Sequence, residues 1–195
     1  MTIYTIDGNI GSGKSTILNY LHKYKHYQID IEPIDKWQCF LDNIYKYKKG
    51  YFNFQIKVWL DRAWIQEKEH KSLIFMERSP FFIRNTFNKN DYNNNNINEE
   101  EFNVINELYN KTDNIWKSNN YIYLKSSPTK CLERIIKRGR ENEVDYISLD
   151  YITDIHLLHE DAYIKALEQK FNIIIIDVDN KEIEDIVKEI LTFVL

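Results

Sequence analysis

The residues with the clearest chemical meaning lie near the start of the chain, in the stretch IDGNIGSGKST at positions 6–16. Glycines let consecutive backbone N–H groups turn inward around a phosphate, and the N-terminus of a following helix adds partial positive charge. A plain strand-to-helix turn would need no lysine and hydroxyl directly behind its last glycine, whereas the pattern G-x-x-x-x-G-K-[ST] requires both. The stretch therefore predicts a phosphate-binding loop made of Gly8, Asn9, Ile10, Gly11, Ser12, Gly13, Lys14, Ser15 and Thr16.

Charged side chains follow two later apolar stretches that read as strands. Glu32 opens EPIDKW, where Pro33 stops the second strand, and Glu77 with Arg78 follows the third strand in MERSP. Ligands of open α/β sheets bind outside the carboxyl ends of the strands. A carboxylate there suits Mg²⁺, and a guanidinium suits a phosphoryl group in transit. One solvated carboxylate at a strand end would be ordinary, but two such ends beside a phosphate loop indicate an active site.

The elements that must position these residues alternate along the chain. Apolar, strand-like runs (TIYTID, YQIDIEP, KSLIFMERS, NYIYLKSS and FNIIIIDV) are separated by helical patterns near 14–24, 36–48, 52–70, 80–88, 98–117, 128–138 and 148–170, and a last helix ends the chain. This alternation predicts an α/β fold with a five-stranded parallel sheet flanked by helices. A chain of 195 residues is expected to form one domain, 1–195.

The Asn-rich stretch at about 88–98 is predicted to be a mobile surface loop, because its composition is polar and of low complexity. Asn88, Lys89 and Asp91 within it spell N-K-x-D, which resembles the guanine-reading motif of GTPases. That motif ends a buried strand in GTPases, and no D-x-x-G switch segment precedes it here. The GTPase interpretation is therefore discarded in favour of loop composition.

Composition narrows the classes of partner and location. The net charge of −4, with both signs spread along the chain, argues against a non-specific nucleic-acid binder. Cys39 and Cys131 are too few and too far apart for a disulfide framework or a zinc site. Neither a basic-then-apolar leader nor an apolar run approaching ~18 residues occurs. We expect a cytoplasmic, reducing location with no membrane and no nucleic-acid partner.

Taken together, the motifs resemble the deoxynucleoside kinase family. The resemblance runs through the phosphate loop, EPIDKW, FNFQIKVWLDR, ERS, LERIIKRGRENE, IHLLHE and IIIIDVD, in the family's order and at similar spacing. It implies a P-loop kinase fold with a short Arg-rich lid at about 138–146. It also implies transfer of the γ-phosphoryl group of ATP, with Mg²⁺, to the 5′-hydroxyl of a deoxynucleoside. The implied partners are a deoxynucleoside and a nucleoside triphosphate, and a homodimer is a candidate assembly.

The resemblance also assigns roles to single residues. Glu32 matches the general base, and Arg78 would lie between that carboxylate and the transferring phosphoryl group. Lys14 would hold the β- and γ-phosphates, while Ser15 and Glu77 would serve Mg²⁺. Positions that match the nucleoside-binding residues are Trp37, Tyr45, Phe54, Gln55, Arg62, Ile83, Phe87 and Glu143. In this set Gln55 reads the base edge, Tyr45 and Glu143 grip the 3′-hydroxyl, and the aromatic residues form walls.

The basic run RIIKRGR has two interpretations. Lysine and arginine clusters are often solvated faces or nucleic-acid patches. Arg134 and Arg138 lie one turn apart on a helix, and Gly139 breaks that helix before Arg140. Hinged arginines can close over a nucleotide and neutralise charge as the phosphoryl group moves. Because the family's lid has this arrangement, Arg138 and Arg140 are predicted to be catalytic and Arg134 to bind the ATP phosphates.

Base preference depends on Ile83, where the family places a polar or small residue. Ile83 supplies no hydrogen bond and should narrow the slot, which favours pyrimidine deoxynucleosides with thymidine first. A thymidylate-kinase-type monophosphate kinase is the main alternative, although Glu32 would repel a phosphate acceptor. A regulatory nucleotide-binding ATPase module is the alternative of another class, and it would need no nucleobase slot.

Overall fold

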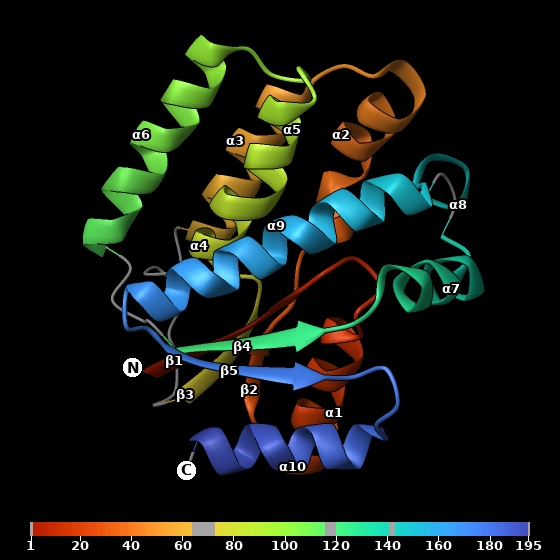
Figure 1. Ribbon diagram of the computed structural model, residues 1–195, viewed down its shortest axis with the longest axis vertical. Helices are drawn as coiled ribbons and strands as arrows, with labels where there is room; N and C mark the ends of the chain where they lie inside the picture. Colours follow the sequence, from red (N-terminus) through yellow and green to blue (C-terminus); the bar gives the residue numbers. More distant parts are fainter. Residues whose placement is uncertain (1, 64–72, 116–119, 141–142, 195) are drawn as a thin grey trace.

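The computed structural model describes residues 2–63, 73–115, 120–140 and 143–194, and within these ranges the chain forms one sheet with helices on both faces. All strands that pair in the sheet run parallel, in the order β2-β3-β1-β4-β5 (Figure 1). Their bounds are β1 Thr2–Gly8, β2 Gln28–Asp30, β3 Leu73–Glu77, β4 Asn120–Lys125 and β5 Asn172–Asp177. The predicted five-stranded parallel sheet is confirmed.

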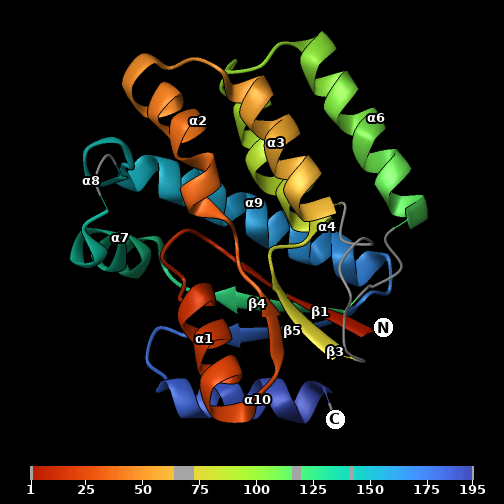
Figure 2. The ribbon, with the colours of Figure 1, turned by 180° about the vertical axis from the view of Figure 1, so that it is seen from behind.

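Helices cover the two faces of the sheet unequally. α1 and α10 lie on one side, whereas α9 and the layer of α2, α3, α5 and α6 lie on the other (Figures 1 and 2). α7 and α8 follow the carboxyl end of β4. The bounds are α1 Lys14–Lys25, α2 Ile34–Tyr47, α3 Tyr51–Ala63, α4 Pro80–Ile83, α5 Lys89–Asn93, α6 Glu99–Ile115, α7 Pro128–Arg138, α8 Glu143–Tyr146, α9 Leu149–Glu168 and α10 Ile183–Val194.

Apolar periodicity explains this layering. Ile6, Leu18 and Val187 belong to a buried cluster between the sheet, α1 and α10. Phe82 of α4, Tyr123 of β4 and Ala162 of α9 pack together on the opposite face of the sheet. A further cluster around Trp37, Val58, Ile83, Ile97, Ile105 and Tyr109 holds the helical layer together. Each layer therefore buries its own apolar stripe.

The strand order brings the charged strand ends next to the phosphate loop. β1 and β3 are neighbours, with Ile6 paired to Glu77 in the register. The loop that follows β1 therefore begins beside Glu77 and Arg78. Parallel sheets bind ligands outside these carboxyl ends, so the sheet topology alone positions the predicted active site.

The Asn-rich stretch is only in part the surface loop that the sequence predicts, because 88–93 are helical whereas 94–98 form a turn in which only Ile97 is buried. A π-helical turn, η1 (Arg84–Asn88), follows α4 and leads directly into α5. Asn88, Asn90, Asp91 and Ile97 are buried. Tertiary burial overrides the local composition at Asp91, whose carboxylate accepts a hydrogen bond from Gln55 of α3.

Several boundaries also differ from the sequence expectation. β2 is only three residues long, and the helix expected over 52–70 is described up to Ala63, since 64–72 lie outside the described residues. Positions 141 and 142 of the predicted lid lie outside them as well. Among the described helices, none combines the length and apolar character needed to cross a bilayer.

Candidate active site

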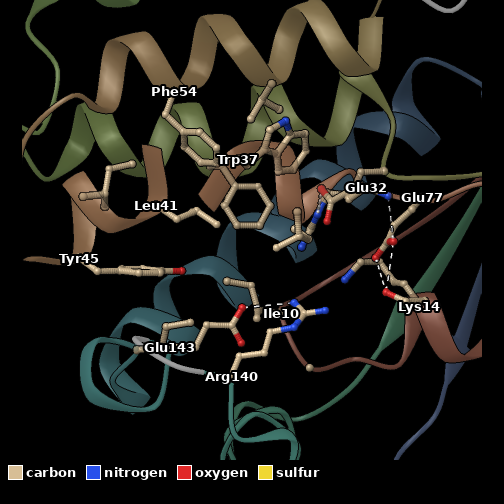
Figure 3. Close-up of a pocket in the computed structure, with 18 of the residues that line it drawn as sticks. Ile10, Lys14, Glu32, Trp37, Leu41, Tyr45, Phe54, Glu77, Arg140 and Glu143 are labelled. Carbon is tan, nitrogen blue, oxygen red and sulfur yellow. Dashed lines mark hydrogen bonds and ion pairs between the residues drawn. The ribbon is translucent and has the colours of Figure 1, made fainter. Parts of the chain in front are cut away.

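A cavity of about 850 Å³ opens beyond the carboxyl ends of β1 and β3, between the phosphate loop, α2, α3 and α8. Figure 3 shows Glu32 and Glu77 beside Lys14 at one end of this cavity, and Tyr45 and Glu143 at the other. A volume of this size suits a small organic ligand, since such sites usually measure about 300–1,000 Å³.

The phosphate loop has the backbone that its glycines predict. Gly11 has a φ of +80°, and a Cβ atom there would lie 2.4 Å from the carbonyl oxygen of Cys131. Only glycine fits this close approach to α7. The Asn9 side chain donates to the carbonyl of Ile152 at 2.8 Å and so ties the loop to α9. The loop is thus braced from two helices and leads straight into the N-terminus of α1.

Lys14 lies buried at the centre of this loop. Its Nζ donates to the Asn9 carbonyl at 2.8 Å. Burial, followed by the charge of Arg78, lowers the pKa of Lys14 to about 8. Negative charge arriving in the loop would stabilise the ammonium form, so the site favours binding of an anion.

Ser15 and Glu77 form the oxygen-rich part of the site. The Ser15 hydroxyl donates to Glu77 Oε1 at 2.9 Å. The other Glu77 oxygen accepts from the backbone N–H of Glu32 at 3.3 Å. One carboxylate and one hydroxyl beside a phosphate loop match the way Mg²⁺ is held, because that ion usually takes one or two carboxylates plus substrate phosphates.

Glu32 and Arg78 form an ion pair at the middle of the cavity. Arg78 Nε lies 2.8 Å from Glu32 Oε1, and both side chains are almost fully buried. Burial raises the pKa of Glu32, while the charge of Arg78 opposes that rise and Glu77 adds to it. Arg78 also donates to the Gly8 carbonyl at 2.9 Å and lies 4.4 Å from the centre of the Phe87 ring. The guanidinium is therefore fixed on three sides.

The backbone at Arg78 is unusual because its φ is +60°, in the left-handed region. Such a conformation costs about 1–3 kcal/mol and persists only where the surrounding structure enforces it. Asp7 supplies that enforcement, since its carboxylate accepts from the Ser79 N–H at 2.8 Å and from the Ser79 hydroxyl at 3.2 Å. Asp7 thus positions Arg78 without lining the cavity.

The far wall of the cavity suits a flat ring. Trp37, Phe54, Ile83 and Phe87 line it, and Trp37 meets Phe54 edge to face with centroids 5.7 Å apart. Gln55 lies in the same wall, and its Nε2 donates to Asp91 at 2.6 Å. These residues lie together as the resemblance implies, with Asp91 as an addition.

The predicted lid lies over the opposite end of the cavity. Arg138 and Arg140 both pair with Glu143, and the Arg140 contact measures 3.4 Å. α7 ends at Gly139, which has a φ of +64°. Burial raises the pKa of Tyr45, and the neighbouring Glu143 adds to that rise. The structure therefore brings together the two residues expected to grip the sugar and the two lid arginines.

Arg134 reaches the phosphate loop from α7. Its guanidinium donates to Ser126 Oγ at 3.0 Å and to the Val178 carbonyl at 3.1 Å, and lies 3.5 Å from the Gly11 carbonyl. It lines the cavity next to Gly11. This position is compatible with the predicted contact to ATP.

Arg62 is not where the resemblance places it. Its side chain is 1% exposed, donates to Asp30 at 2.8 Å and to the Glu77 carbonyl at 2.6 Å, and does not line the cavity. The guanidinium thus points to acceptors at the ends of β2 and β3. The prediction that Arg62 contacts the nucleoside is corrected accordingly.

Sequence reasoning missed two acids of this region. Asp91 was noticed only as part of the discarded N-K-x-D pattern, yet it lines the cavity beside Gln55. Asp7 interrupts an otherwise apolar strand directly before Gly8, and that interruption was the available signal. Both acids are buried.

Comparison with known proteins agrees with this geometry. The family model for deoxynucleoside kinase matches residues 4–195. "Deoxycytidine kinase 2" of Gallus gallus is 30% identical, covering 95% of this chain and 85% of the relative. "Putative kinase protein 143R" of Invertebrate iridescent virus 6 is 36% identical over 80% of this chain and 78% of its own. "Deoxycytidine kinase" of Homo sapiens is 29% identical over 80% of this chain and 73% of its own. The chain belongs to the deoxynucleoside kinase family, whose members are phosphotransferases that use ATP as the phosphoryl donor.

Proposed function

We propose that this kinase phosphorylates the 5′-hydroxyl of a pyrimidine deoxyribonucleoside. The observation that carries the proposal is the buried Glu32–Arg78 pair, which lies between the phosphate loop and the aromatic slot. A nucleoside in the slot and a triphosphate in the loop would meet at this pair. A carboxylate at the acceptor suits a hydroxyl, whereas it would repel a monophosphate.

Glu32 acts as the general base in this proposal. Burial raises its pKa, and a more basic carboxylate takes a proton from an alcohol more readily. Arg78, held by Glu32, Gly8 and Phe87, offers its guanidinium to the phosphoryl group as that group passes from the leaving oxygen of ATP to the attacking oxygen of the nucleoside. Their fixed geometry means that little reorganisation is needed during the transfer.

Ser15 and Glu77 would hold Mg²⁺, since their oxygens lie 2.9 Å apart at the edge of the phosphate loop. When bound, the ion would neutralise charge on the β- and γ-phosphates. Lys14 would supply a second positive charge to the same phosphates. Arg138 and Arg140 would leave Glu143 in part and close over the nucleotide.

The slot supports a single-ring base, because Ile83 and the aromatic walls of Phe54 and Phe87 enclose it. The sequence argument ranks thymidine first among pyrimidines, since Ile83 offers no hydrogen bond. The relatives named deoxycytidine kinases lend that ranking no support. The Asp91 carboxylate beside Gln55 also opposes that ranking.

The decisive experiment gives the purified protein ATP with Mg²⁺ and a panel of acceptors. Turnover with deoxynucleosides and none with deoxynucleoside monophosphates supports the proposal. Phosphorylation of monophosphates alone would instead identify a monophosphate kinase, and hydrolysis of ATP without any acceptor would identify a regulatory ATPase. A purine preferred tenfold, or by about 1.4 kcal/mol, would contradict the pyrimidine assignment.

A further inference from the structure

The segment expected to be a polar loop contributes an acid to the nucleobase wall. Ile83 and Asp91 are eight positions apart, and the helix between them contains the π-helical turn of η1. Both side chains line the cavity, so both belong to the face of this segment that points toward it. At the nucleobase wall, this segment thus presents the apolar side chain of Ile83 and, about two turns further along, the carboxylate of Asp91.

Asp91 restricts the amide of Gln55. Gln55 Nε2 donates to Asp91 Oδ2 at 2.6 Å. Turning the amide over would place its oxygen against the carboxylate, where both groups can only accept. A glutamine whose amide can rotate by about 180° is able to pair with the edge of cytosine or with that of thymine. The hydrogen bond to Asp91 allows Gln55 only one of the two orientations.

The Gln55–Asp91 pair offers a bound base more hydrogen-bond acceptors than donors. Gln55 Oε1 is buried and has no hydrogen-bond partner among the described residues. The carboxylate of Asp91 adds further acceptor oxygens, whereas only one N–H of the Gln55 amide remains uncommitted. Burial raises the pKa of Asp91 to about 6, so the group is still ionised at pH 7.5. Its titratable neighbours Tyr51 and Tyr151 stay protonated there, because burial raises the pKa of each.

Cytosine complements such a wall better than thymine does. The exocyclic amine of cytosine offers two N–H donors beside the N3 acceptor, whereas thymine offers one N–H between two carbonyl oxygens. A thymine carbonyl near the buried Asp91 carboxylate would be repelled, and in the fixed orientation of Gln55 it would face the amide oxygen, which is an acceptor, in place of a donor. An unpaired polar group in a buried site is costly, which makes it an effective means of rejection.

We propose that Asp91 is a specificity-determining residue, which locks the Gln55 amide and selects a pyrimidine that carries an exocyclic amine over one that carries a carbonyl at that position. The inference rests on the proposed function and concerns the same site. It assigns the Asn-rich segment a role in choosing the substrate.

The test compares kcat/KM for deoxycytidine and thymidine in the wild type, Asp91→Asn and Asp91→Leu at pH 7.5. We expect the wild type to prefer deoxycytidine at least tenfold, and each variant to lower that ratio about tenfold. Asp161→Asn is the matched control, because it removes the same charge from an exposed site that faces Lys89 of the same segment at 4.0 Å. Its ratio should equal that of the wild type.

Equal losses for both nucleosides in the folded variants would overturn the inference and leave Asp91 a structural role. A wild-type preference for thymidine would also overturn it, while the proposed function would stand. No turnover with any deoxynucleoside would refute the proposed function itself. Circular dichroism and thermal midpoints identify folded variants, and the leucine variant serves where the asparagine variant does not fold.

Discussion

At the scale of single residues, the site depends on buried charges that neighbours hold in place. Glu32, Arg78, Lys14 and Glu77 lie together in one cavity with little exposure. Ionised groups are expensive to bury unless they are paired. Here Glu32 is paired with Arg78, and Glu77 accepts from Ser15. The same groups face the cavity, where they can meet the hydroxyl and the phosphates of the substrates.

Glu32→Gln should lower kcat by roughly a hundred- to ten-thousand-fold, because glutamine cannot take the proton of the 5′-hydroxyl. ATP affinity should change little, since Glu32 does not belong to the phosphate loop. Single-turnover rates and equilibrium binding of ATP measure the two effects separately. Near-normal turnover would remove Glu32 from the mechanism.

Asp7→Asn tests the residue that positions Arg78. Burial raises the pKa of Asp7 to about 6 from 3.8, so the native state binds its proton more tightly than the unfolded chain does. The free energy of unfolding should therefore fall as pH rises from about 4 toward 6 and beyond, by up to about 3 kcal/mol from this group.

Asparagine keeps the acceptor for Ser79 and has no charge, so the variant should show a flatter dependence of stability on pH. Urea unfolding of both proteins at pH 4.5 and pH 7.5 measures this change in the free energy of unfolding with pH. Asp42→Asn, which changes a partly exposed acid on α2, is the control and should leave the slope unchanged. An unchanged slope in Asp7→Asn would contradict the assigned cause.

At the scale of elements, the predicted lid includes the end of α7 and the short helix α8. α7 stops at Gly139, and Glu143 at the start of α8 holds both Arg138 and Arg140. In this structure both arginines are therefore paired with Glu143, which itself lines the cavity. For Arg138 and Arg140 to leave the Glu143 carboxylate and reach the phosphates of a bound nucleotide, only a local movement would be needed.

Arg138→Ala and Arg140→Ala should each reduce kcat more than they weaken ATP binding, if these arginines meet charge mainly in the transition state. Lys130→Ala, which removes an exposed charge from the same helix, is the control. Loss of ATP affinity alone would make the arginines ground-state clamps. Loss of DNA or RNA binding with intact kinase activity would support the basic-patch interpretation.

The sheet could be predicted from sequence because its strands are apolar runs between helical patterns, and the phosphate loop because its glycines, Lys14 and Ser15 stand at fixed spacing. The Asn-rich segment could not, because what folds it is burial against Gln55 and its neighbouring helices, which no local pattern records. Arg62 was misplaced for a related reason. The motif fixes its position on α3, but the acceptors that attract its guanidinium come from β2 and β3.

At the scale of the whole molecule, Arg62 joins the helical layer to the sheet. It reaches from α3 to Asp30 at the end of β2 and to the Glu77 carbonyl at the end of β3. Asp30 is 8% exposed and Arg62 1% exposed. The contact therefore holds α3, which contributes Phe54 and Gln55 to the slot, against the ends of β2 and β3.

Arg62→Met should lower the free energy of unfolding by about 3–5 kcal/mol, because it leaves the Asp30 carboxylate buried without its guanidinium. Lys57→Met is the control from the same helix, since its pair with Asp61 is partly exposed and should contribute about 1 kcal/mol or less. Urea unfolding compares the two variants. The ratio of kcat/KM for deoxycytidine and thymidine should stay within about twofold of the wild type, because Arg62 does not line the cavity. A large change in that ratio would mean that Arg62 reaches the base after all.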